Sequence, residues 1–140
     1  MRSIAIAVTT AVLVASLSVA ALAVPPAATV ENLLDSERTV LDQPFSYPQG
    51  DARITAAVVT LAPGASTARH LHAVPLFAYI LKGQLIVDYE SEGERVYRRG
   101  DTLDEAIDWP HRGRNGGKGV VKILVVYAGA VGVPNSEILE

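Results

Sequence analysis

The sequence of 140 residues contains no cysteine and only three histidines. The lack of cysteine excludes disulfide bonds, thiolate nucleophiles and thiolate metal sites, so any bound metal ion must have nitrogen and oxygen ligands. It also excludes a lipoprotein anchor, which requires an acylated cysteine. Hydrophobic residues make up 49% of the chain, which at this length is enough for the core of one domain.

A clear excess of basic charge is also missing. The chain has 12 basic and 15 acidic residues and a net charge of −3. The basic residues of the second half are interspersed with acidic residues and glycines. Because a nucleic-acid-binding surface needs a basic face with aromatic side chains, we expect no nucleic-acid partner.

The longest hydrophobic run lies at the N-terminus. One early Arg2 precedes the uncharged run from Ile4 to Ala23, which ends in Ala21-Leu22-Ala23 and is followed by Pro25-Pro26. This pattern predicts a secretory signal peptide over residues 1–23, with cleavage near Ala23 and a periplasmic or secreted mature protein without a stable membrane anchor. The alternative is an uncleaved anchor, because about 20 apolar residues can span a bilayer.

The remainder of the chain predicts an all-β fold. Short segments rich in β-branched and hydrophobic residues are separated by glycine, proline and charged turns. The strongest predicted strands are Arg53–Leu61, Phe77–Leu81, Gln84–Tyr89 and Val120–Tyr127. The first of these is expected to be buried on much of its surface, and Gly83 is expected to form a turn with positive φ. Without a long helix, the pattern indicates a sandwich or barrel.

The histidines have a spacing that suits metal binding. His70 and His72 are two residues apart, so on an extended strand they point to the same side, about 7 Å apart. His111 would complete a three-histidine site if the fold returns it to the same cavity. A single histidine is more often a surface or hydrogen-bonded side chain, and this simpler interpretation stays open for each of the three.

The surroundings of the first two histidines follow a known motif. Gly64 is followed by five residues, then His70-Leu71-His72, and Gly83 comes later at a fixed distance. This spacing resembles the first motif of the cupin superfamily, specifically of its small single-domain bacterial members. The motif's usual glutamate falls on Leu76, so the chain departs from the family pattern there.

The residues around the third histidine resemble the second cupin motif. Gly100, His111 and Asn115 stand at the motif's spacing. Ala106 and Asp108 replace the usual proline and glycine. The resemblance implies a double-stranded β-helix, or jelly-roll, barrel over residues 50–130. It also implies an N-terminal lead-in over 24–49, a C-terminal tail over 131–140, and a metal ion held inside the barrel by the three histidines.

The missing glutamate bears on the metal. The resemblance implies a divalent transition metal, with Fe, Zn or Mn as candidates, and three histidines alone suit Zn or Fe(II) with open positions. Asp88 or Asp108 is a candidate replacement for the carboxylate lost at Leu76. Alternatively, the site has decayed, and the histidines bind an organic anion or nothing.

Other residues are expected to shape the cavity. Leu76, Tyr79 and Trp109 are candidates for its lining, although plain packing also explains Tyr79 and Trp109. Asn115 is interpreted as a turn residue and not as a ligand.

Two functions are compatible with these features. The first is a metal-dependent enzyme of the cell envelope, a dioxygenase or isomerase acting on a small oxygen-rich molecule. The second is a non-catalytic barrel that binds a small ligand or a metal ion. By analogy with similar barrels, which often pair edge strands, a homodimer is expected.

Overall fold

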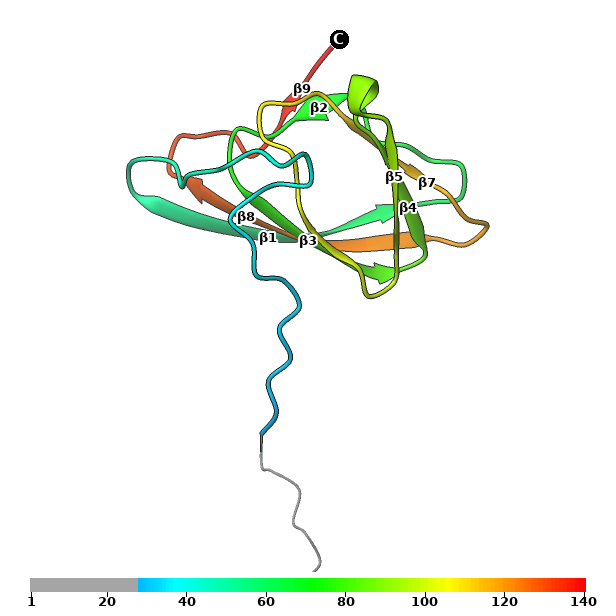
Figure 1. Cartoon of the computed structure of the whole chain (residues 1–140). Coiled ribbons are helices and arrows are strands. Elements are labelled where there is room, and N and C mark those ends of the chain that lie inside the picture. Colours follow the sequence, from blue (N-terminus) through cyan, green and yellow to red (C-terminus); the bar gives the residue numbers. More distant parts are fainter. Residues whose placement is uncertain (1–27) are drawn as a thin grey trace, which may run out of the picture. The chain divides into compact units, whose positions relative to one another are not determined.

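The computed structural model describes residues 28–140 (Figure 1). The predicted signal peptide, residues 1–23, lies outside the described residues. In residues 28–140, no helix is long and apolar enough to cross a membrane.

The described chain consists of short strands and one turn of 3₁₀-helix, η1 (Glu90–Glu92). The strands are β1 (Ala52–Leu61), β2 (His70–Leu71), β3 (Leu76–Lys82), β4 (Gln84–Asp88), β5 (Glu94–Arg98), β6 (Thr102–Asp104), β7 (Arg112–Asn115), β8 (Val121–Ala130) and β9 (Glu137–Ile138). The prediction of an all-β fold is therefore confirmed.

The strands form three antiparallel sheets. One has the order β1-β8-β3-β6, a second has the order β5-β4-β7, and β2 pairs with β9. In Figure 1, β1, β8 and β3 run together, while β4, β5 and β7 gather at another side of the barrel. Apart from the hairpin of β4 and β5, neighbours in a sheet come from distant parts of the sequence, as expected for a jelly-roll barrel.

The core lies between the sheets and follows the alternation of the strands. Along β3, Leu76, Ala78 and Ile80 are buried, whereas Phe77 and Tyr79 are only partly buried on the opposite face. Because successive side chains of a strand point to opposite faces, β3 has one side toward the core and one toward the outside.

The expectation of a buried strand over Arg53–Leu61 is wrong for the single chain. Only Leu61 of β1 is buried, while Ile54 and Val58 are 67% and 54% exposed. The physical reason is the position of β1 at the edge of its sheet, where only β8 pairs with it in the described part of the chain. An apolar, β-branched strand therefore lies on the surface.

Gly83 connects β3 and β4 in a turn that only glycine fits. Its φ is +83°, which confirms the predicted positive-φ turn. A Cβ atom at this position would lie 2.7 Å from the carbonyl oxygen of Val120. The turn thus needs both the unusual backbone conformation and the close approach of the neighbouring chain.

Candidate metal centre

The three histidines come from two backbone segments that are hydrogen-bonded to each other. The N–H of His70 donates to the carbonyl of His111 at 3.0 Å, and the N–H of His111 donates to the carbonyl of His70 at 2.9 Å. Residues that face each other in this way point their side chains to the same side. His72 is two residues further along, so it shares that side with His70.

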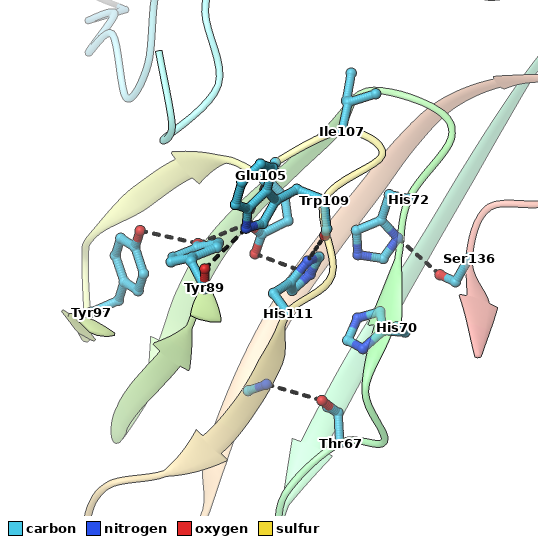
Figure 2. Close-up of polar contacts among 12 residues, drawn as sticks. Thr67, His70, His72, Tyr89, Tyr97, Glu105, Ile107, Trp109, His111 and Ser136 are labelled. Atoms are coloured by element: carbon cyan, nitrogen blue, oxygen red, sulfur yellow. Dashed lines mark hydrogen bonds and ion pairs between the residues drawn. The ribbon is translucent and has the colours of Figure 1, made fainter. Parts of the chain in front are cut away.

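All three imidazoles consequently surround one space (Figure 2). The ring centroids of His70 and His72 are 4.9 Å apart, those of His70 and His111 4.5 Å, and those of His72 and His111 5.1 Å. One nitrogen from each ring lies within 4.8 Å of the others, so the group could hold a metal ion.

Each ring is fixed by a backbone carbonyl at its Nδ1 atom. His70 Nδ1 lies 2.8 Å from the Ala68 oxygen, and His111 Nδ1 lies 2.8 Å from the Trp109 oxygen. His72 Nδ1 lies 2.9 Å from the backbone carbonyl oxygen of Asn135 and 3.0 Å from Ser136 Oγ. Because a carbonyl only accepts, Nδ1 carries the hydrogen in every ring. Nε2 then keeps its lone pair for a ligand.

Burial favours the neutral form of His70 and His72. His72 and His111 are buried, and His70 is partly buried. Desolvation lowers the pKa of His72 to about 3, although its bond to the Asn135 carbonyl acts in the opposite direction. Desolvation also lowers the pKa of His70. Neutral imidazole is the form that binds metal ions, so the site has the chemistry of a metal centre.

The histidines open into a cavity of about 80 Å³. Its wall is mainly apolar and includes Leu76, Ala78, Leu85, Leu103, Ile123 and Val125. Leu76 therefore lies in the wall, at the position of the missing motif glutamate. The lining also includes Tyr127, whose ring is 5.6 Å from that of His72.

The other two expected lining residues lie elsewhere. Tyr79 is on the opposite face of β3 from Leu76, because the two are three positions apart and side chains alternate between the faces of a strand. Trp109 is partly buried against the core, and its Nε1–H donates to the Tyr89 carbonyl at 3.0 Å. Neither belongs to the residues that line the cavity.

A carboxylate does face the cavity, but it is neither of the two expected. Asp88 accepts a hydrogen bond from the Glu90 N–H, Asp108 is exposed, and neither lines the cavity. Glu105 lines the wall, and its Oε2 atom is 3.8 Å from Nε2 of His111. The alternation with buried Leu103 places Glu105 on the inner face, a signal that the sequence contains.

A hydrogen-bonded network lies behind Glu105. Tyr89 donates its hydroxyl hydrogen to Glu105 Oε1 at 2.7 Å, and the hydroxyl groups of Tyr89 and Tyr97 are 3.3 Å apart. Burial raises the pKa of Tyr89, and the nearby Glu105 charge raises it further. The phenol therefore stays protonated and remains a donor to the carboxylate.

Two further residues were not found from the sequence, because they lie in the C-terminal tail. Asn135 and Ser136 reach His72 because β9 pairs with β2, in the register His70 opposite Ile138. Asn115, the last motif residue, holds a loop through backbone carbonyls and does not line the cavity.

The part of the chain that carries the histidines matches a known family. The family profile described as "Cupin domain" matches residues 57–127, about half of the chain and the part that carries all three histidines. Among curated proteins compared by sequence, none matches.

Solved structures with a similar fold include several enzymes. They include the oxalate decarboxylase of Lactobacillus farciminis in a formate complex (TM-score 0.53, 23% identity, 61% of this chain and 26% of that chain). Another is the DMSP lyase DddQ from Ruegeria pomeroyi (TM-score 0.53, 22% identity, 61% of this chain and 42% of that chain). A third is the polyketide cyclase RemF from Streptomyces resistomycificus (TM-score 0.54, 20% identity, 65% of this chain and 63% of that chain).

At these identities the likeness is one of fold. The chain spans less than two thirds of the length of each of the three similar proteins.

Proposed function

The chain belongs to the cupin superfamily, and from this we propose that it is a metal-dependent enzyme acting on a small, oxygen-rich molecule. The observation that carries the proposal is the common anchoring of the three Nδ1 atoms to backbone carbonyls. Such anchors are the usual outer partners of metal-bound histidines, because they fix the tautomer and the ring orientation. His70, His72 and His111 would hold the ion through Nε2.

The size and the lining of the cavity are the contribution of the protein to substrate binding and to the reaction. When bound, a divalent transition metal polarises an oxygen ligand or lowers the pKa of bound water. The apolar wall limits access of water and strengthens electrostatic interactions inside. Among residues 28–140, no lysine or arginine lines the cavity, and about 80 Å³ is well below the ~300 Å³ of sites for drug-sized ligands. These features favour a small substrate that binds through the metal.

Metal content followed by turnover tests this function. The chain, purified without an affinity tag, is expected to hold about one divalent ion per chain, because three imidazoles form a complete facial set. The iron-loaded protein is then assayed for oxygen consumption with catechols and 2-oxo acids, and the zinc- and manganese-loaded proteins for isomerisation of hydroxy ketones. Turnover that disappears on metal removal supports the enzyme.

Two results would contradict it. A chain that retains no added Fe, Zn or Mn would rule out the metal site. A fully loaded chain without turnover would instead favour the non-catalytic binding module.

The proposal includes the cell envelope as the location because of the signal-peptide pattern in residues 1–23. A mature envelope protein that retains these residues would contradict this location.

We infer that the chain forms a homodimer through β1 and the outer face of its sheet. Ile54 and Val58 are exposed, and the register places them beside Ala128 and Leu124 of β8. Tyr79 of β3 is paired with the same Leu124. These residues form a continuous apolar face next to an edge strand, and a second copy related by a two-fold axis would cover both.

The double variant Ile54→Lys/Val58→Lys is expected to convert the dimer into a monomer. Like charges that meet at a two-fold interface cost several kcal/mol, so the dimer dissociation constant should rise by more than about 100-fold. Sedimentation at micromolar concentrations measures the change. Val131→Lys, which adds one charge at an apolar site 65% exposed but outside β1, serves as the control and should remain dimeric. A wild-type chain that sediments as a monomer would overturn the inference.

A further inference from the structure

Glu105 occupies the same level of the barrel as the missing motif glutamate. The backbone N–H of Glu105 donates to the carbonyl of Leu76 at 2.9 Å, so the two residues are neighbours on adjacent segments. Both side chains line the cavity that the histidines face. A carboxylate is therefore present beside the position from which the family motif would supply one.

The two oxygens of this carboxylate have different surroundings. Oε1 accepts hydrogen bonds from the Tyr89 hydroxyl at 2.7 Å and from the Ala106 N–H at 2.8 Å. Oε2 has no hydrogen bond within residues 28–140, and its nearest ionisable partner is His111 Nε2 at 3.8 Å. Glu105 is only 7% exposed and lines the cavity, so Oε2 is free to bind a ligand there.

The atom that faces Oε2 is an acceptor in the neutral imidazole, which is the form that binds metal ions. His111 Nδ1 donates its hydrogen to the Trp109 carbonyl, which leaves a lone pair on Nε2. The two atoms are 3.8 Å apart, a distance too long for a direct hydrogen bond. A divalent cation binds imidazole nitrogen and carboxylate oxygen at about 2.0–2.2 Å each, so this separation suits two ligands of one ion.

We propose that Glu105 is the fourth metal ligand, and that its Oε2 replaces the carboxylate lost at Leu76. This inference rests on the proposed metal site of the three histidines. It changes the chemistry expected there, because a carboxylate lowers the net charge of the site by one, raises its metal affinity and makes the ion less Lewis acidic. Tyr89 then acts as a positioning residue that holds Oε1 so that Oε2 faces the ion.

The test compares metal binding by the wild-type chain and by Glu105→Gln. Glutamine keeps an oxygen acceptor for Tyr89 and for the Ala106 N–H, so folding should be retained, as checked by circular dichroism. The Co²⁺ dissociation constant is measured by competition with a chelating dye, and the coordination by the visible spectrum of bound Co²⁺. Loss of outer partners alone costs about 10–100-fold in affinity, so we expect a loss of about 100-fold or more, together with a changed spectrum.

Two companion variants show whether the position matters. Glu92→Gln removes the same charge at an exposed site and should bind Co²⁺ like the wild type. The exchange variant Leu76→Glu/Glu105→Gln returns the carboxylate to the motif position and should recover most of the lost affinity. An unchanged affinity or spectrum in Glu105→Gln, or an equal loss in Glu92→Gln, would overturn the assignment. A wild-type chain that binds no Co²⁺ would instead refute the three-histidine site itself.

Discussion

The double variant His70→Ala/His72→Ala is expected to retain no divalent metal at concentrations that saturate the wild-type chain. Both residues direct Nε2 into the space shared with His111, so the variant loses two of three nitrogen ligands in one change. If each lost ligand costs about 100-fold, the affinity falls by about 10⁴-fold. Elemental analysis after equilibrium dialysis against Zn²⁺ measures the difference.

Tyr127→Phe is the matched control for this variant. Tyr127 lines the same cavity and packs its ring against His72, but nothing in the geometry assigns its hydroxyl group to the metal. The control should therefore keep the wild-type metal content. Full metal content in the double variant, in a protein that melts like the wild type, would place the ion elsewhere and would remove the basis for the proposed function.

The histidine cluster was predictable because it depends on local geometry. The spacing of His70 and His72 fixes their common side once the segment is extended, and this needs no knowledge of the rest of the fold. His111 is different, since its place depends on backbone pairing with His70 across 41 positions of sequence. The family motif supplied that information in place of a physical derivation.

The carboxylate could not be placed for a related reason. The motif predicts a carboxylate at the position of Leu76. Glu105 instead lies at the end of the adjacent strand, where its N–H donates to the Leu76 carbonyl. The alternation with Leu103 predicts that the Glu105 side chain points to the inner face of the sheet. Only the pairing of β3 with β6, however, brings Glu105 to the level of the histidines. Contacts of the tail residue Asn135 with His72 depend on pairing in the same way.

Burial of β1 was overestimated because composition does not show which strand lies at an edge. By their strand propensity, Val58 and Ile54 fit a central strand as well as an edge strand. Strand propensity describes how well a side chain fits a half-buried pleated surface, and it does not show the place of the strand in its sheet. In the single chain this strand has one neighbour, β8. The mismatch between an apolar sequence and an exposed position is itself the main support for the proposed dimer.

Asn115→Ala is expected to be strongly destabilising without affecting metal binding. Asn115 is 8% exposed, and its Nδ2 group lies within 3.1 Å of the carbonyls of Leu61, Ala62 and Gly119, while Oδ1 accepts from the Gly117 N–H. Removal of the side chain takes one hydrogen bond from each of these four backbone groups, of which the Leu61 carbonyl belongs to a buried residue. The net loss of one hydrogen bond costs about 1 kcal/mol, so we expect a total loss of about 2–4 kcal/mol and a Tm lower by about 10 °C.

Asn115→Asp separates the hydrogen bonds from the shape of the side chain. Aspartate has nearly the same size, but it replaces the donating NH₂ group with an oxygen that faces three carbonyls. At neutral pH this variant should therefore be at least as unstable as Asn115→Ala. Thermal melts of both variants are compared with Asn32→Ala, an exposed control that should change stability by less than about 0.5 kcal/mol. If the Asn115 variants keep the wild-type Tm but lose Zn²⁺ affinity, the motif asparagine acts on the metal and the structural role argued from its carbonyl contacts is wrong.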